Sequence, residues 1–159
     1  MGRECLCNRH QPNANRCGFK HFYTYCLPRI FYTKNNTLKQ KELSLKYFNK
    51  KEFSCSCCGL NNMNEDTLKM LDHARGYSGI AYKITSGTRC EECNLKAGGK
   101  LNSSHLNGYA ADIFCESSRN RARIIYGLIE AGFTRIGIHP KFVHADNDPK
   151  KVEGVIFLY

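Results

Sequence analysis

Two segments of the chain carry apolar residues at helical spacing. The stronger pattern predicts a helix over residues 119–131 that begins after Ser117 or Ser118 and is ended by Gly132. Its apolar stripe consists of Ile124, Ile125, Leu128 and Ile129. The other pattern predicts a helix over residues 65–75 with Asn64 as its N-cap. The apolar face of this helix consists of Leu68, Leu71 and either Met70 or Ala74.

Short runs of apolar and β-branched residues predict five strands. These runs cover residues 80–85, 109–115, 134–138, 142–146 and 155–158, and a short helix is expected over residues 90–96. Pro140 and the segment Asn147-Asp148-Pro149 mark the turns between the last three strands. Because tight turns join antiparallel strands, we expect an α+β fold with helices packed on a small, mostly antiparallel sheet.

The N-terminal part of the chain differs from the rest in pattern and in charge. Residues 1–43 show no periodicity, and of the net charge of +10, residues 1–51 carry +9. We therefore expect a basic, cysteine-rich, irregular extension over residues 1–43 and one domain over residues 44–159, with Phe53 in its core. Such an extension can bind nucleic acid or an anionic wall polymer, or be a solvated tail. No nucleic-acid-binding motif is visible, and a solvated tail is favoured.

The chemistry of the chain is concentrated in residues 103–112. His105 and Asp112 supply an imidazole and a carboxylate, which are preferred ligands of zinc, and Gly108 allows a tight turn between them. Asp112 stands in an apolar run, where a carboxylate requires a compensating charge. A metal ion supplies that charge, although the pair by itself is also compatible with two unrelated polar groups.

The spacing Ser103-x-His105-x-x-Gly108-x-Ala110-x-Asp112 resembles the signature of the zinc D-Ala-D-Ala carboxypeptidases and related peptidoglycan peptidases, peptidase family M15. The resemblance covers about the last three-quarters of the chain and is closest to small phage-encoded members. It implies a Hedgehog/DD-peptidase-like fold. It also implies one catalytic zinc ion held by His105, Asp112 and His144, with the fourth ligand position left to water.

The same resemblance implies roles for further residues. The stretch Ser86-Gly87-Thr88-Arg89 matches a family motif whose arginine contacts the substrate, and Ser103 matches a serine that helps to hold it. Many members carry an acidic general base three residues before the last ligand, but here that position is Lys141. We expect Asp146 to serve as the base, and Asp148 and His139 are further candidates.

Ten cysteines are a high number for a chain of this length. Five of them, outside the extension, occur at spacings compatible with a second, structural zinc site, namely Cys55, Cys57, Cys58, Cys90 and Cys93. Disulfides and free thiols are the alternatives, and the sequence does not decide among the three.

Taken together, these features predict a zinc-dependent hydrolase that cuts an amide bond in the peptide stem of peptidoglycan. The resemblance implies a D-Ala-D-Ala carboxypeptidase or an endopeptidase, used in phage lysis or infection. The alternative is a catalytically inactive zinc-binding domain that recognises the cell wall. No signal peptide and no membrane-spanning run are visible, so we expect a monomer in the host cytoplasm that another factor delivers to the wall.

Overall fold

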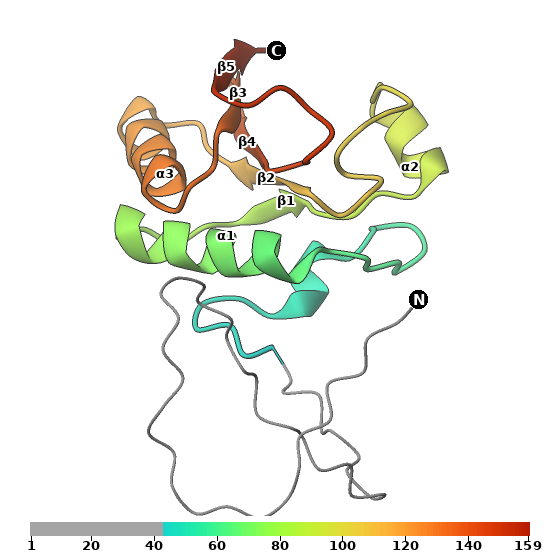
Figure 1. Ribbon diagram of the computed structural model, residues 1–159, viewed down its shortest axis with the longest axis horizontal. Helices are drawn as coiled ribbons and strands as arrows, with labels where there is room; N and C mark the ends of the chain where they lie inside the picture. The colour runs from blue at the N-terminus through green and yellow to red at the C-terminus, as the bar shows by residue number, and fades with distance from the viewer. Residues whose placement is uncertain (1–42) are drawn as a thin grey trace, which may run out of the picture. The chain divides into compact units, whose positions relative to one another are not determined.

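The computed structural model describes residues 43–159, and the chain there has the α+β fold that the sequence predicts (Figure 1). In chain order, the elements are η1 (Lys50–Phe53), α1 (Glu65–Ser78), β1 (Ile84–Ser86), α2 (Glu91–Lys96), β2 (Ala110–Phe114), α3 (Ser118–Glu130), β3 (Arg135–His139), β4 (Phe142–Asp146) and β5 (Val155–Leu158). The expected extension over residues 1–43 lies outside the described residues except for Leu43, which is half-buried against the core.

The five strands form one mixed sheet in the order β1-β2-β4-β3-β5. Three of the pairings are antiparallel, as expected, but β5 pairs in parallel with β3. The expectation of a tight turn between the last two strands is therefore wrong. Residues 147–154 form a longer connection that passes β3, and Arg135 holds it through a hydrogen bond from its Nη1 to the carbonyl oxygen of Val152 at 2.6 Å.

Helices α1 and α3 pack on one face of the sheet (Figure 1). The Asn64 side chain accepts hydrogen bonds from the backbone amides of Asp66 and Thr67, so the predicted N-cap is confirmed. Gly127 of α3 lies so close to α1 that an added Cβ would be 2.4 Å from the carbonyl oxygen of Ala74. Glycine at this position therefore allows the two helices to approach closely.

The hydrophobic core lies between these helices and the sheet. It includes Leu68, Leu71 and Ala74 of α1, Ile124 and Leu128 of α3, and Ala111, Ile113, Ile136, Val143 and Ala145 of the strands. The predicted apolar stripe of α3 is correct for two of its members, whereas Ile125 is half-buried and Ile129 is 52% exposed. Because side chains alternate along a strand, the other face of the sheet carries a separate set of residues.

Phe53 fills the core beside η1, as predicted. Its side chain is fully buried, and its ring lies 5.3 Å from that of Phe48 in an edge-to-face arrangement. The backbone of Gly87 passes directly over Phe53, and the backbone amide of Thr88 donates a hydrogen bond to the carbonyl oxygen of Phe53 at 2.8 Å. The segment after η1 and the segment after β1 are thereby fixed to each other.

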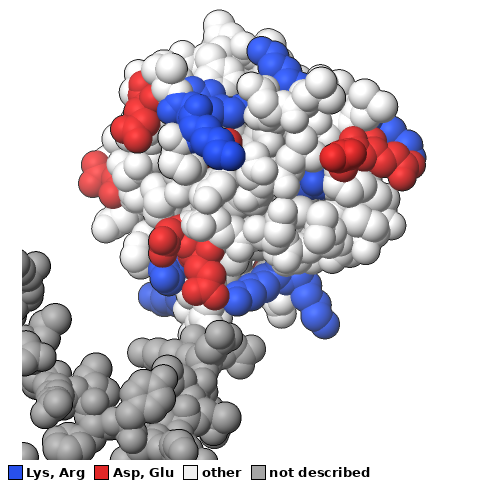
Figure 2. Space-filling view, turned by 45° about the vertical axis from the view of Figure 1, so that its right-hand side comes forward, with Lys and Arg blue, Asp and Glu red and all other residues white. Residues whose placement is uncertain are grey.

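The surface of residues 43–159 carries both signs of charge. On the face drawn in Figure 2, basic and acidic side chains are interspersed. Among the helices of this described part of the chain, none has the length and apolar character required to cross a bilayer.

Candidate metal centre

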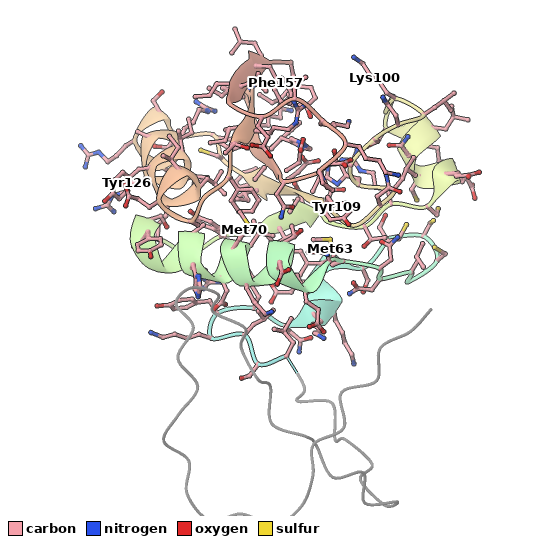
Figure 3. All side chains as sticks on the ribbon, in the orientation of Figure 1. Met63, Met70, Lys100, Tyr109, Tyr126 and Phe157 are labelled. Carbon is pink, nitrogen blue, oxygen red and sulfur yellow. The ribbon has the colours of Figure 1, made fainter. Side chains whose placement is uncertain are left out.

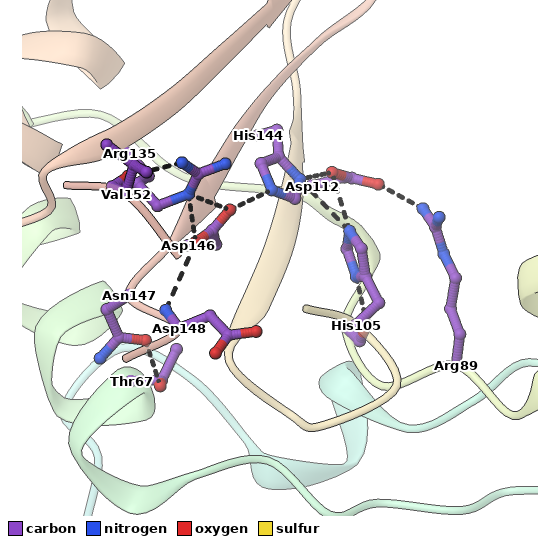
Figure 4. Close-up of polar contacts among 11 residues, drawn as sticks. Thr67, Arg89, His105, Asp112, Arg135, His144, Asp146, Asn147, Asp148 and Val152 are labelled. Carbon is purple, nitrogen blue, oxygen red and sulfur yellow. Dashed lines mark hydrogen bonds and ion pairs between the residues drawn. The ribbon is translucent and has the colours of Figure 1, made fainter. Parts of the chain in front are cut away.

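The residues of the site share the face of the sheet opposite the helices. Asp112 of β2 pairs with His144 of β4, and His144 pairs with Gly137 of β3. Directly opposed residues point to the same face, so the carboxylate and the imidazole meet there. His105 reaches the same place from the loop before β2 (Figure 4).

Three donor atoms converge at this place. The Oδ1 atom of Asp112 lies 2.8 Å from Nδ1 of His144 and 3.3 Å from Nε2 of His105, and the two nitrogens are 3.3 Å apart. Ligands of a tetrahedral zinc ion at 2.0–2.1 Å are separated by about 3.3 Å. All three side chains are buried. The donor set and its spacing therefore fit a zinc ion.

A backbone carbonyl orients His105. Its Nδ1 lies 2.6 Å from the carbonyl oxygen of Gly87. Because a carbonyl oxygen can only accept, Nδ1 carries the proton, and the lone pair of Nε2 faces the other two donors. The contact of Gly87 with Phe53 holds that carbonyl in place.

A second carboxylate orients His144. The Nε2 atom of His144 donates to Oδ2 of Asp146 at 3.1 Å, on the side of the ring away from Asp112 (Figure 4). Arg135 in turn binds Asp146 through Nε, 3.0 Å from Oδ1 and 3.2 Å from Oδ2. This chain of contacts fixes the histidine ring and leaves Nδ1 for a metal ion.

The protonation equilibria reflect the crowding of charged groups. Burial alone would raise the pKa of Asp112, but hydrogen bonds from His105 and His144 outweigh it and hold the pKa well below the usual value. Burial alone would lower the pKa of His144, but Asp112 and Asp146 outweigh it and raise the pKa. The two carboxylates thus favour a proton on His144, and a divalent cation bound at Nδ1 would displace that proton.

Arg89 contacts the remaining oxygen of the ligand carboxylate. Its Nη2 lies 2.5 Å from Oδ2 of Asp112, and its Nε donates to the hydroxyl of Ser86 at 2.7 Å. The guanidinium therefore leaves Oδ1 of Asp112 to the metal side. The Arg89 side chain is still 18% exposed and lines the cleft beside the site, and its contact with a substrate stays a prediction.

The three donors lie in a cleft of about 760 Å³. Lys100, on the loop after α2, and Phe157, on β5, both line this cleft and are labelled in Figure 3. The predicted substrate-binding residue Ser103 lines it as well. Asp112 and Asp146 supply its carboxylate side chains within the described part of the chain, and both are already engaged by basic side chains.

The geometry does not support Asp146 as the general base. Its side chain is 2% exposed, and both oxygens are held by Arg135 and by the far nitrogen of His144. The sequence placed Asp146 on the correct face, but it did not show that the ring of His144 would separate this carboxylate from the metal side. Asp148 is no better placed, because it caps the turn at Lys150 and does not line the cleft.

His139, the other predicted catalytic residue, lines the cleft on β3. Its ring stacks on that of Phe142 at 4.3 Å between centroids. The Nδ1 atom of His139 accepts a hydrogen bond from the backbone amide of Lys141 at 3.1 Å. In the neutral ring the proton therefore sits on Nε2, which is a donor. Lys141 itself is exposed and does not line the cleft.

The cysteines form a second cluster, for which the sequence proposed five members. The sulfur atoms of Cys55, Cys57, Cys90 and Cys93 all lie within 4.8 Å of one another. Cys58 is exposed and is not part of this cluster, so its inclusion was wrong. No disulfide joins any of these cysteines in the structure.

Sequence reasoning missed Arg135 and Gly137. Arg135 pairs with Asp146 across the β3–β4 hairpin, and an added Cβ at Gly137 would lie 2.8 Å from Phe157 and 3.0 Å from Cβ of His144. The sequence could have indicated Arg135, because a hairpin that turns at Pro140 places Arg135 directly opposite Asp146. The sequence could not have indicated Gly137, because the space around it is filled by a side chain of β5, whose pairing was not predicted.

Comparison with known proteins agrees with this geometry. The family model described as Peptidase M15 matches residues 37–146, which include all three donor residues. A comparison with curated protein sequences gives no match. The match covers more than half of the chain, and it confirms the family indicated by the spacing of His105 and Asp112. On this basis the chain belongs to peptidase family M15.

Proposed function

We propose that this protein is a zinc-dependent peptidase that hydrolyses an amide bond in the peptide stem of peptidoglycan. The observation that carries the proposal is the convergence of the donor atoms of His105, Asp112 and His144 at tetrahedral spacing in an open cleft. A zinc ion at this place supplies a Lewis acid that polarises the carbonyl and acidifies a water molecule.

The charges of the cleft favour a substrate that carries a carboxylate. Arg89 and Arg135 are paired with Asp112 and Asp146, whereas Lys100 and Lys151 line the cleft without an ion-pair partner among residues 43–159. Two lysines that line the cleft and are not engaged in such a pair suit the terminal carboxylate of a stem peptide. Among the activities that the resemblance implies, this supports a carboxypeptidase over an endopeptidase.

His139 lines the cleft and offers a ring N–H to a bound substrate. As the ring is held, Nε2–H can donate a hydrogen bond to the substrate, but a neutral imidazole cannot give this proton up to a leaving amine. To accept a proton from water, His139 must first release the backbone amide of Lys141. We therefore assign His139 the role of hydrogen-bond donor to the substrate and Arg89 that of a contact to the substrate carbonyl or carboxylate.

One observation favours a second function, a domain that binds the wall peptide without cutting it. Within the described residues, both carboxylates of the cleft are engaged by basic side chains, and the position where many relatives carry an acidic base is Lys141. A site of this kind would still hold zinc and substrate, but it would have no group ready to take a proton from water.

The test uses the purified full-length chain loaded with zinc. Stem pentapeptides ending in a free carboxylate or in an amide are incubated with the protein, with and without a chelator, and are followed by mass spectrometry and by calorimetric binding. Cleavage of the free acid that the chelator abolishes supports the peptidase. Binding without cleavage supports the recognition domain, and neither binding nor cleavage overturns both.

The role of the lysines has its own matched control. Lys151→Ala and Lys100→Ala should raise KM for the free-acid peptide, with little effect on the amide. Lys150→Ala, which changes a neighbouring exposed lysine outside the cleft, should leave KM unchanged. An equal effect of all three substitutions would indicate a general effect of charge.

A further inference from the structure

A second group of metal-ligating side chains lies outside the site described above. We propose that Cys55, Cys57, Cys90 and Cys93 bind a structural zinc ion, and that this ion fixes the segment carrying Arg89 and α2 against the loop after η1. The proposal concerns these four side chains and does not depend on whether the cleft hydrolyses a peptide.

The positions of the sulfur atoms suit a tetrahedral ion. The Sγ atom of Cys57 lies 3.2 Å from that of Cys90 and 3.6 Å from that of Cys55, and all four sulfurs lie within 4.8 Å of one another. Four thiolates around zinc at 2.3 Å are separated by about 3.8 Å. Four sulfur donors select zinc over calcium or magnesium, which prefer oxygen ligands.

The surrounding backbone is arranged to receive negatively charged sulfurs. The amide of Cys90 donates to Sγ of Cys55 at 3.4 Å, and the amide of Cys93 donates to Sγ of Cys90 at 3.4 Å. Gly59, with φ of +71°, closes a turn in which its amide donates to the carbonyl oxygen of Cys55. The turn brings Cys55 and Cys57 toward the start of α2. Such hydrogen bonds orient thiolate ligands and offset part of their charge.

Helix α2 has little else to hold it in place. It has six residues, which is too short for a helix that is stable alone, and Asn94 is its one buried residue. The apolar side chain of Leu95 is 73% exposed. Since the helix contributes no apolar face to the core, cross-linking of Cys90 and Cys93 through a metal ion provides the stabilisation that packing does not.

The consequence for the cleft follows from chain connectivity. Arg89 precedes Cys90, and the segment from Ala97 to Lys100, which lines the cleft, follows Cys93 closely. One side of the cleft is therefore built on Cys90, the N-cap of α2, and on Cys93 within this helix. The other two ligands belong to the loop that follows Phe53, which is fixed to Thr88 by a backbone hydrogen bond. A zinc ion at the four cysteines would hold these parts together.

A disulfide between Cys57 and Cys90, whose sulfurs lie 3.2 Å apart, is the principal competing state. It would use two of the four thiols and leave Cys55 and Cys93 without a role. Cys58 provides an internal control, because it neighbours Cys57 in sequence but is exposed and outside the cluster.

The experiment measures zinc per full-length chain by mass spectrometry of the elements, after purification with zinc and without oxidant. Cys57→Ser and Cys93→Ser should each lower the zinc content by one ion relative to the unmodified chain, and Cys58→Ser should not. His105→Ala should remove a different ion, so that His105→Ala combined with Cys93→Ser loses two. Because differences are compared, zinc bound elsewhere on the chain does not affect the reading.

Hydrogen exchange provides a second measurement that is independent of activity. The amides of Cys90 and Cys93 should exchange faster in Cys57→Ser, while the amides of β2 and β4 remain protected, which also shows that the variant is folded. The proposal is overturned if the cysteine variants retain all their zinc, if Cys58→Ser loses as much as Cys57→Ser, or if the intact mass of the purified chain shows a Cys57–Cys90 disulfide.

Discussion

Replacing Asp146 by asparagine separates the two roles that this residue can have. The carboxylate accepts a hydrogen bond from Nε2 of His144 and pairs with Arg135, and its side chain is 2% exposed. Asp146→Asn preserves the shape of the side chain and removes its charge. If Asp146 positions the histidine, the substitution acts on metal affinity, and if Asp146 is the base, it acts on turnover.

The structure sets the magnitude of each outcome. Loss of the carboxylate that orients a metal-binding histidine weakens metal binding by about 10–100-fold. At about 1.4 kcal/mol per tenfold change, this corresponds to roughly 1.4–2.8 kcal/mol. Removal of a general base would instead lower kcat by about 10²–10⁴-fold while zinc affinity stays the same. We expect the first result, because His144 separates Asp146 from the metal side.

Arg135 adds a second, measurable consequence. Its side chain is 14% exposed and would lose its charged partner, which costs about 1–3 kcal/mol of unfolding free energy. Arg135→Gln in the Asp146→Asn background should therefore be less destabilising than the sum of the two single substitutions. The deviation from additivity measures the coupling within the pair.

The assay combines a zinc competition titration with kcat measured at saturating zinc. Asp148→Asn serves as the matched control, since Asp148 is a buried aspartate two residues away that contacts neither His144 nor the cleft. It should leave zinc affinity unchanged. Unaltered zinc affinity in Asp146→Asn, together with a 10²-fold or greater loss of kcat, would refute the positioning role and restore the base predicted from the sequence.

Four further predictions concern pH, metal affinity, one glycine and the N-terminal residues. The metal-free protein should be more stable at pH 6 than at pH 8 in chemical denaturation with chelator. The reason is the raised pKa of His144, whose contribution to the unfolding free energy is complete below the usual pKa of 6.5. This contribution is lost as pH rises through the raised pKa. Zinc affinity should change in the opposite direction and increase with pH, since His144 must release its proton to bind the ion, and a zinc titration at each pH checks this. Gly87→Ala should lower the unfolding free energy by about 1–3 kcal/mol, because its Cβ would lie 2.5 Å from the backbone oxygen of Phe53. As a control, Gly76→Ala in α1 should be neutral or stabilising, because its Cβ would meet only the ring of Tyr47 at 3.4 Å. Deletion of residues 1–37 should leave a cooperative thermal transition and zinc binding at His105, because the core residues of the described part of the chain begin at Leu43. Loss of the transition would place part of the extension inside the domain.

Local sequence was sufficient for the features that depend on neighbouring residues. The N-cap at Asn64, the buried face of Leu68 and Leu71, and the strand over residues 142–146 all follow from patterns a few residues long, and each is present in the structure. The spacing of His105 and Asp112 also carried the family assignment. Where an apolar pattern was ambiguous, as at Ile129, burial by neighbouring elements decided which residues entered the core.

The remaining features depend on contacts between distant segments, which no local pattern encodes. The parallel pairing of β5 with β3 results from the connection that passes β3 and is held by Arg135, so the expected hairpin did not form. Alternation along β4 correctly placed Asp146 on the face of His144, but only the orientation of the imidazole decided that the carboxylate lies behind the ring rather than beside the metal. The exclusion of Cys58 has the same cause, because the turn closed by Gly59 and the start of α2 together determine which sulfurs meet.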